Sequence, residues 1–501
     1  MVQDFSCVLN YGDKAVVIGE EGNGKSTLMK WIYDPQMIED YAVGSGERVM
    51  NNERFGYLPQ ELPDRDKEKT ICEFFMEEPL FFEKTPKELG RLAHDFHVPM
   101  DFFYEDRRMQ SLSGGEKVKA QMMRLLLTEP TVLLLDEPSN DIDMETLEWL
   151  EEMILQWPYI VLYISHDEAL IEKTANVVIH LEQLRRKTQS RYTVAHIPYL
   201  QYVEERQLHF ARQEMRAESE RREQKMKEEK LKRLEQKVSN RLDNISKAER
   251  DGVGRLLKKK MKAVKSMEKR FDREAENMTQ MPEEETAIFF KLGENTEKLP
   301  SGKMVLDISL PSLFTADGSR ELSKEVHLQV RGNEKICIVG KNGVGKTTLL
   351  RRIAKQLLQR DDIHAEYMPQ NYEELLELDV TPVEYLSISG DKEEQTRIRT
   401  YLGSLKYTPE EMGHPIARLS GGQKAKVLLL KMSLSGANVL ILDEPTRNFS
   451  PMSGPVIRRM LAEFPGAIIS ISHDRKYIAE VCDKVYELTS QGVFSKTVNG
   501  L

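Results

Sequence analysis

The stretch Gly19-Glu-Glu-Gly-Asn-Gly-Lys25-Ser26 has the spacing Gly-x4-Gly-Lys-Ser/Thr, which is typical of a loop that binds phosphate groups. Its glycines let backbone N–H groups curve around an anion, and the following helix directs its N-terminus at the same charge. The apolar residues before the loop are typical of a strand, and the residues after it open a helical pattern. The stretch therefore predicts an α/β domain with a phosphate-binding loop.

The same pattern occurs twice. The loop recurs as Gly340-Lys-Asn-Gly-Val-Gly-Lys346-Thr347, which lies 321 residues further on. Three more blocks, Leu112-Ser-Gly-Gly, Leu134-Leu-Asp-Glu-Pro and Ile164-Ser-His-Asp, recur in the same order 307 residues later. Two homologous α/β domains in tandem follow from this order, and the first holds additional residues after its loop.

A different kind of segment separates the two repeats. We assign residues 1–185 to the first domain, 186–290 to a linker and 291–501 to the second domain. The linker is rich in helix-forming residues, and its one strong breaker is Asp251-Gly-Val-Gly254. It predicts a long antiparallel α-helical hairpin with its tip at about 240–254 and a first helix of roughly 40 residues, about 60 Å long.

Two apolar stripes at helical spacing predict the seam of this hairpin. They consist of Leu231, Leu234, Val238, Leu242 and Ile245, and of Leu257, Met261, Val264, Met267, Phe271 and Ala275.

Charge is concentrated in the hairpin. The chain of 501 residues has a net charge of −10, yet residues 225–270 hold 17 Lys+Arg against 7 Asp+Glu, a local balance of +10. A basic segment on an acidic body indicates contact with nucleic acid. The alternative is an ordinary solvated helix face.

The repeated blocks contain the residue types that nucleotide hydrolysis needs. The loop lysines are expected to reach the β- and γ-phosphates of a nucleotide, and the hydroxyls after them to bind Mg²⁺. Carboxylates that end apolar strands are expected to hold the same Mg²⁺, and the glutamates next to them to polarise the attacking water. These are Lys25 and Lys346, Ser26 and Thr347, Asp136 and Asp443, and Glu137 and Glu444.

Two further pairs complete the predicted catalytic set. Gln60 and Gln370 follow the loop lysines by 35 and 24 residues, and a neutral amide there could contact Mg²⁺ or the water. His166 and His473 follow the glutamates by 29 residues in both copies. Each histidine ends an apolar strand, at the sheet edge where ligands bind, and could hydrogen-bond a γ-phosphate.

The Leu-Ser-Gly-Gly block resembles the signature of the ATP-binding-cassette ATPases, and this resemblance covers both repeats, about four fifths of the chain. In that family the signature of one domain binds the γ-phosphate of ATP held by the other domain. The resemblance therefore implies two composite sites, Lys25 with Ser420 and Lys346 with Ser113. The ATP-binding residues that it implies are Gly19, Gly22, Gly24, Lys25, Ser26, Thr27, Ser113, Gly114, Gly115, Gly340, Gly343, Gly345, Lys346, Thr347, Thr348, Ser420, Gly421 and Gly422.

Two such domains joined by a charged helical hairpin resemble the ABC-F subfamily. Its members bind the ribosome at the tRNA exit site and extend the hairpin toward the P-site tRNA and the peptidyl-transferase centre. This implies contact with large-subunit ribosomal RNA and tRNA. The candidate RNA-binding residues are Arg241, Asn244, Arg250, Lys258, Lys259 and Lys260.

One local feature resembles the antibiotic-resistance group of ABC-F. The chain continues after Glu444 as Pro-Thr-Arg447-Asn-Phe-Ser450-Pro, where the family usually has Asn-His-Leu-Asp. The resemblance implies protection of the ribosome from pleuromutilins, lincosamides and streptogramin A. A housekeeping ABC-F translation factor is the main alternative.

Other classes fit the sequence less well. A transporter ATPase subunit would dock on a membrane partner and would not need a basic hairpin between its domains. DNA-repair relatives place their coils inside one domain or carry zinc cysteines, whereas the four cysteines here are far apart. No apolar run reaches the ~18 residues that span a bilayer. We therefore expect a cytoplasmic monomer without a membrane subunit, which pairs its two domains intramolecularly.

Overall fold

A computed structural model describes residues 2–184, 189–243, 253–276, 278–279, 281, 292–293, 296–315 and 317–497. They form two compact units, Met1–Tyr199 with Glu285–Leu501, and Leu200–Glu284. The first unit contains both α/β domains and the second is helical. The predicted hairpin tip, with Asn244 and Arg250, lies outside the described residues except at its flanks.

The first domain is built on a six-stranded sheet in the order β2-β3-β4-β1-β5-β6. All neighbours are parallel except β5 and β6. Its strands are β1 (Lys14–Ile18), β2 (Phe55–Leu58), β3 (Val132–Asp136), β4 (Ile160–Ile164), β5 (Val177–Leu184) and β6 (Gln189–Ala195). The strands β1 and β3 are buried along their whole length, as expected for apolar runs covered on both faces.

The second domain repeats this sheet as β10-β11-β12-β9-β13-β14, again antiparallel only at the β13–β14 edge. A two-stranded antiparallel sheet, β7 with β8, precedes it. The strands are β7 (Met304–Phe314), β8 (Glu321–Arg331), β9 (Lys335–Val339), β10 (Ala365–Met368), β11 (Val439–Asp443), β12 (Ala467–Ile471), β13 (Lys484–Thr489) and β14 (Gly492–Lys496).

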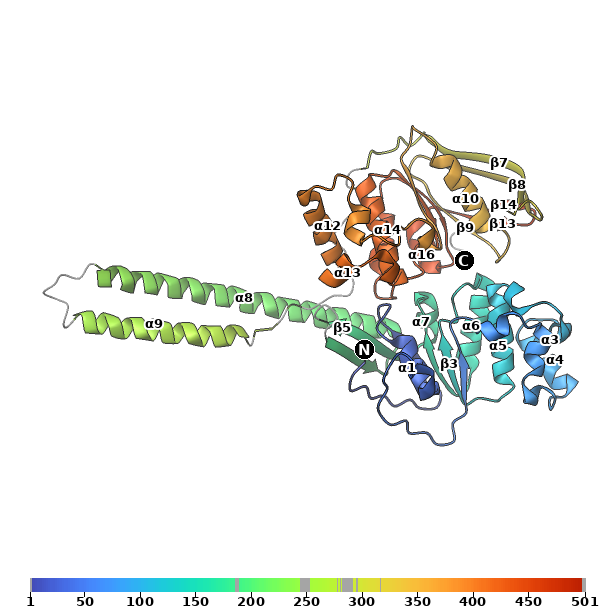
Figure 1. Cartoon of the computed structure of the whole chain (residues 1–501), viewed down its shortest axis with the longest axis horizontal. Coiled ribbons are helices and arrows are strands. Elements are labelled where there is room, and N and C mark those ends of the chain that lie inside the picture. Colours follow the sequence, from blue (N-terminus) through green and yellow to red (C-terminus); the bar gives the residue numbers. More distant parts are fainter. Residues whose placement is uncertain are drawn as a thin grey trace. The chain divides into compact units, whose positions relative to one another are not determined.

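Helices cover the sheets and complete each domain (Figure 1). In the first domain they are α1 (Lys25–Tyr33), α2 (Asp64–Lys67), α3 (Ile71–Met76), α4 (Pro86–Asp95), α5 (Gly114–Leu126), α6 (Met144–Gln156) and α7 (Glu168–Thr174), with 3₁₀ turns η1 (Pro35–Ile38), η2 (Pro79–Phe81), η3 (Met100–Tyr104) and η4 (Met109–Ser111). In the second they are α10 (Lys346–Leu357), α11 (Pro382–Leu386), α12 (Lys392–Ser404), α13 (Pro409–Gly413), α14 (Gly421–Ser435), α15 (Gly454–Ala462) and α16 (Arg475–Val481), with η6 (Tyr372–Glu374) and η7 (Ile416–Arg418).

The helical unit consists of α8 (Tyr199–Asp243) and α9 (Val253–Glu276), with α9 running alongside α8 (Figure 1). The first helix has 45 residues and the second has 24. Leu231, Leu257 and Val264 are buried in the seam, as the stripes predict. Leu234 and Met267 are exposed instead. One narrow seam cannot cover every apolar position of a helix that has a single partner.

The tandem α/β architecture and the long intervening helix are confirmed. The boundary between the first domain and the linker is shifted. Residues 189–195, which we assigned to the linker, form β6 and extend the first sheet beyond β5. The polar composition of this edge strand gives little sign of its place in a sheet.

Candidate nucleotide-binding sites

Each phosphate-binding loop is held against the last parallel strand of its own sheet. A Cβ atom added at Gly19 would collide with the carbonyl oxygen of Leu181 in β5, and one at Gly340 would collide with that of Leu488 in β13. Both glycines also have φ values, 145° and 146°, that other residues rarely adopt. The close approach to the strand therefore requires glycine at the start of each loop.

The loop lysines are buried and point back into their own loops. The ammonium group of Lys25 donates to the carbonyl oxygen of Gly19 at 2.8 Å, and that of Lys346 to Gly340 at 2.7 Å. Burial lowers the pKa of Lys346, while nearby carboxylates that include Glu444 oppose the shift. Each loop thus holds a buried cation against its own backbone, and a glycine-rich loop of this kind suits an anion.

The strand-ending aspartates lie beside the hydroxyl at the start of each loop helix. Ser26 donates to Asp136 at 2.9 Å, and the hydroxyl of Tyr57 lies 3.3 Å from the other Asp136 oxygen. Burial raises the pKa of both Asp136 and Asp443 to about 6. One carboxylate oxygen of Asp443 is buried with no hydrogen-bond partner among the described residues. A hydroxyl and a buried carboxylate are oxygen donors that fit Mg²⁺.

The two glutamates that follow have the same unusual backbone. Glu137 and Glu444 have φ values of 52° and 53°, and their N–H groups donate to Ile164 and Ile471 at 3.0 and 2.9 Å. A left-handed conformation in a residue with a side chain is strained, and such strain is concentrated at functional sites. Because both copies have this conformation, we infer that each site requires it at its glutamate.

The electrostatic environments of the two glutamates differ. His166 lies 3.1 Å from Glu137, and although burial acts against it, this histidine with Lys25 and Asn140 lowers the pKa of Glu137 to about 2. His473 lies 3.7 Å from Glu444, whose pKa is raised to about 8 by burial and by the charge of Asp443. Burial and then Lys346 lower the pKa of His473 to about 4. The two sites are therefore not electrostatically equivalent.

The Leu-Ser-Gly-Gly blocks place helix N-termini at the interface between the two domains. Ser113 caps α5 and Ser420 caps α14, each in a capping box with the residue three positions later, Glu116 or Gln423. The caps fix the first turn of each helix, so the glycine N–H groups that follow are presented in a defined direction.

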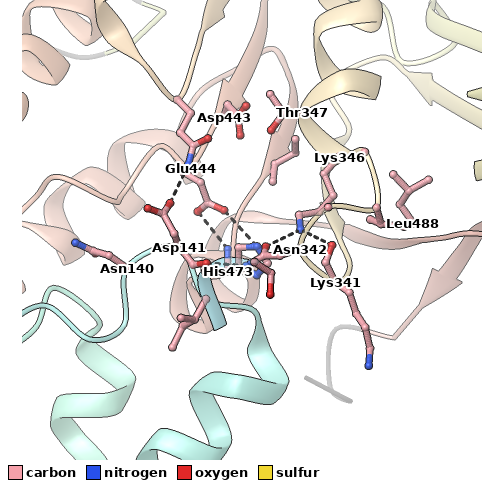
Figure 2. Close-up of a pocket in the computed structure, with 18 of the residues that line it drawn as sticks. Asn140, Asp141, Lys341, Asn342, Lys346, Thr347, Asp443, Glu444, His473 and Leu488 are labelled. Atoms are coloured by element: carbon pink, nitrogen blue, oxygen red, sulfur yellow. Dashed lines mark hydrogen bonds and ion pairs between the residues drawn. The ribbon is translucent and has the colours of Figure 1, made fainter. Parts of the chain in front are cut away.

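A large cavity lies between the second phosphate-binding loop and the first signature. Its volume is about 1190 Å³. Figure 2 shows Lys346, Glu444 and His473 of its second-domain wall together with Asn140 and Asp141 of the first domain. One wall contains Lys346, Thr347, Asp443, Glu444 and His473 of the second domain, and the other contains Ser113, Gly114, Asn140, Asp141 and His166 of the first. Gln370 also lines it. The structure thus brings together the residues of the composite site that pairs Lys346 with Ser113.

Asp141 joins the two walls of this cavity, a role that the repeated motifs do not predict. Its carboxylate forms a two-pronged ion pair with Arg447 at 2.8 Å and accepts a hydrogen bond from Gln370 at 3.2 Å. Its backbone carbonyl accepts a hydrogen bond from Asn342 at 2.7 Å. The signal available in the sequence was Arg447, which stands where the first copy has Asn140, in a stretch that differs between the two copies as far as Ser450.

The interface between the first phosphate-binding loop and the second signature is nearly closed. Its cavity has a volume of only about 20 Å³ and is lined by Glu20, Glu21, Ser420, Gly422 and Asn448, among others. The backbone N–H of Gly422 donates to the carboxylate of Glu21. His166 places its Nδ1 atom 2.9 Å from the carbonyl oxygen of Phe449, across the same interface.

Ion pairs across the interface between the two domains all have the same polarity. Within the described part of the chain, the acid lies in the first domain and the base in the second in every such pair. The pairs are Lys341–Glu145, Lys426–Glu20, Arg447–Asp141, Arg458–Glu168, Arg475–Glu151, Lys476–Glu168 and Lys476–Glu172. The interface is therefore electrostatically complementary.

A partly buried carboxyl group, that of Asp167, lies beside the interdomain ion pair of Arg475. Asp167 caps α7 by accepting the N–H of Leu170 at 2.7 Å. Burial and the charges of Asp474 and Glu151 raise its pKa to about 6, against the opposing effects of the Leu170 N–H and of Arg475.

Other residues differ from the predictions. Gln60 follows β2 as Gln370 follows β10, but it is exposed and is not among the residues that line the small cavity at the first loop. Phe314 is 47% exposed and does not line the large cavity, whereas Leu322 and Val344 do. Ser450 replaces the capping aspartate of the first copy and bonds only locally, to Ser453 at 3.0 Å.

The chain matches a known protein family over more than half of its length. Residues 2–140 and 323–447 match the family described as ABC transporter. The chain belongs to this family. It contains two tandem ABC ATPase domains and is an ATP-hydrolysing enzyme.

Several relatives resemble this ABC ATPase along almost its whole length. The ribosome protection protein VmlR of Bacillus subtilis is 26% identical over 96% of this chain and 83% of its own. The ABC transporter F family member 5 of Arabidopsis thaliana is 25% identical over 97% of this chain and 72% of its own.

A solved structure has the same tandem fold. The archaeal ribosome recycling factor aABCE1, determined in complex with the ribosomal stalk protein aP1, matches with a TM-score of 0.57 and 17% identity. The match covers 98% of this chain and 87% of that chain. At this identity the likeness concerns the fold alone. In the described part of this ABC ATPase, no helix combines the length and apolar character needed to cross a membrane.

Proposed function

We propose that this ABC ATPase is an ABC-F protein of the antibiotic-resistance group. It binds the ribosome at the tRNA exit site and uses its hairpin to protect the peptidyl-transferase centre from pleuromutilins, lincosamides and streptogramin A. The observation that carries this proposal is the basic helical hairpin between two ATPase domains that already face each other within one chain. The similarity of the chain to VmlR, a ribosome protection protein, supports it.

The surface of the hairpin suits an RNA partner. Lys258, Lys259 and Lys260 are exposed on α9, and Arg241 is exposed near the end of α8. Exposed cations attract a phosphate backbone whatever its sequence, and this attraction weakens with salt. The proposal therefore assigns to these residues the contacts with large-subunit RNA or P-site tRNA, in the cytoplasm and without a membrane subunit.

In the proposed mechanism, ATP joins the two domains of a monomer. Lys346 and Thr347 bind the phosphates from one side, and the α5 N-terminus at Ser113 binds the γ-phosphate from the other. Lys25 and Ser26 act in the same way with Ser420 at the first site. The loop hydroxyl and the adjacent aspartate, with Gln60 or Gln370, would hold Mg²⁺, which would supply positive charge against the phosphates.

Hydrolysis then separates the domains. Glu137 and Glu444 polarise the water, while His166 and His473 hold the γ-phosphate. Loss of that phosphate removes the group that both domains bind. The two domains, which close on ATP like a clamp, then separate, and the hairpin leaves the ribosome.

Two measurements test the proposal with the full chain. The first is co-sedimentation with ribosomes in ATP, at about 0.1 and 0.5 M KCl. Replacing Lys258, Lys259 and Lys260 together with Gln should weaken binding several-fold and reduce its salt dependence. The matched control replaces Lys298, Lys355 and Lys392, exposed lysines of the second domain, and should bind as wild type.

The second measurement is growth of a sensitive host on the three drug classes. Wild type should protect and the hairpin variant should not. A variant that loses ribosome affinity yet protects fully would contradict the proposal.

The second candidate is a housekeeping ABC-F translation factor. The relative named as an F family member favours it, because that name carries no reference to resistance. Nucleotide-dependent ribosome binding without protection against any drug would support this alternative. Binding to a membrane fraction and not to ribosomes would favour a transporter subunit.

A further inference from the structure

The two phosphate-binding loops differ in charge at equivalent positions. The first loop reads Gly19-Glu20-Glu21-Gly22, whereas the second reads Gly340-Lys341-Asn342-Gly343. A carboxylate in a loop that receives phosphate groups is unfavourable unless it has another partner, because like charges repel at short range. Two successive glutamates in the first loop therefore call for a physical reason.

The carboxylate of Glu21 is bound to the opposite domain. The N–H of Gly422, in the first turn of α14, donates to its Oε2 atom. A Cβ atom added at the neighbouring Gly421 would lie 3.4 and 3.5 Å from the two Glu21 oxygens. The ammonium group of Lys426 lies 3.3 Å from Glu20. An anionic oxygen of the chain thus already occupies the donor-rich end of α14, and the cavity there is small, about 20 Å³.

The second loop behaves differently at the equivalent residue. The side chain of Asn342 donates to the backbone carbonyl of Asp141 at 2.7 Å, and Lys341 pairs with Glu145 at 2.7 Å. Neither side chain brings a negative charge to the N-terminus of α5. The large cavity lies at this interface.

We propose that Glu21 is a specificity-determining residue of the first composite site, whose carboxylate takes the place of a terminal phosphate at the N-terminus of α14. The inference rests on the proposed assignment of Lys25 and Ser420 to one ATP site. A nucleoside triphosphate must displace Glu21 before the signature can grip its γ-phosphate. A nucleoside diphosphate ends one phosphate earlier and leaves the contact between Glu21 and Gly422 in place.

The consequence is a division of labour between the two sites. The second site closes on ATP by direct contact between its phosphate and α5. The first site discriminates less between ATP and ADP, because the chain supplies its own anion for α14. A charge-assisted hydrogen bond to a carboxylate is strong enough to change this preference by about ten-fold.

The test measures nucleotide affinity at the first site alone. In the full chain with Lys346→Ala, which disables the second site, calorimetry compares AMP-PNP with ADP in the presence of Mg²⁺. Glu21→Gln should tighten AMP-PNP binding about ten-fold and ADP binding less than about three-fold. Glu21 is exposed, so its replacement leaves the core intact and thermal unfolding should be unchanged.

Two controls separate the possible failures. Glu20→Gln removes one negative charge from the same loop but not the contact with Gly422, so it should leave the ratio of the two affinities unchanged. The double variant Lys25→Ala with Lys346→Ala should bind neither nucleotide. If it binds both normally, the site assignment and this inference are overturned together. If it binds neither and Glu21→Gln leaves the affinity ratio unchanged, the role of Glu21 alone is overturned.

Discussion

The ion pair between Arg458 and Glu168 offers a direct test of how the two domains are held together. The side chain of Arg458 is 3% exposed and that of Glu168 is 11% exposed, with 2.8 Å between the charged atoms. Lys476 lies 3.1 Å from the other oxygen of the same glutamate. The perturbation is Glu168→Gln, which keeps the size of the side chain and removes its charge.

The magnitude follows from burial and from the remaining partners. At an effective dielectric constant near 20, two unit charges about 4 Å apart interact by about 4 kcal/mol. Removing one partner of a buried pair typically costs about 3–5 kcal/mol. Arg458 keeps Glu480 at 2.8 Å and Lys476 keeps Glu172. We therefore expect Glu168→Gln to lower the free energy of unfolding by about 2 kcal/mol, less than the full range.

Urea unfolding measures the effect in a double-mutant cycle with Arg458→Met. The coupling energy should be about 1–2 kcal/mol, because the two residues are in contact. The matched control is Glu145→Gln, which removes an interdomain pair with Lys341 whose side chains are 65% and 76% exposed. That substitution should cost less than about 0.5 kcal/mol, as exposed pairs do.

An equal loss of unfolding free energy in Glu168→Gln and Glu145→Gln would refute this expectation. Equal costs would mean that burial does not strengthen the interdomain pairs. A coupling energy near zero between the two buried residues would mean that their proximity carries no free energy.

Three further results are expected. In wild type, stability should fall as pH rises from about 4 to 6, because folding raises the pKa of Asp167 and the folded state keeps its proton. Asp167→Asn should reduce that slope, to which Asp136 and Asp443 with their raised pKa also contribute, and should raise the free energy of unfolding by up to about 3 kcal/mol at pH 7; an unchanged slope in denaturation curves would contradict this. Gly19→Ala should lower the free energy of unfolding by about 3 kcal/mol or more, because the added Cβ would collide with a strand carbonyl oxygen. Gly22→Ala, where the space around the residue is open, should lower it by about 1 kcal/mol; thermal unfolding of both variants measures the difference. Replacing both Glu137 and Glu444 with Gln should preserve ATP binding and prolong residence on ribosomes, and release as fast as wild type would refute the clamp.

Periodicity and repeated motifs were sufficient to predict the architecture. Apolar strands such as β3 and β11 are recognisable because they are buried along their whole length. The helices α8 and α9 follow from composition. The strand β6 was missed because an edge strand with a polar sequence has no periodic signal, and the exposure of Leu234 depends on which neighbours the partner helix supplies.

The composite sites could be outlined but not completed from the sequence. Each motif identifies residues of one domain only. That the phosphate-binding loop of one domain faces the Leu-Ser-Gly-Gly block of the other was predicted from the family resemblance. Asp141 and Glu21 escaped notice because each acts through a contact about 300 or more residues away in the chain. The contrast between Glu137 and Glu444 depends on small differences in histidine distance and burial, which a repeated motif cannot express.

In the interdomain ion pairs that the structure describes, the acid is always in the first domain and the base in the second, and this determines which domains can associate. When two domains arise by duplication, their interdomain surfaces are at first identical, so each domain can also bind a second copy of itself. Here one face contributes carboxylates and the other contributes ammonium and guanidinium groups, so self-association would set like charges against each other. If the two domains were expressed as separate chains, we therefore expect a first domain to pair with a second domain and not with another copy of itself. Such a heterodimer would restore both composite sites.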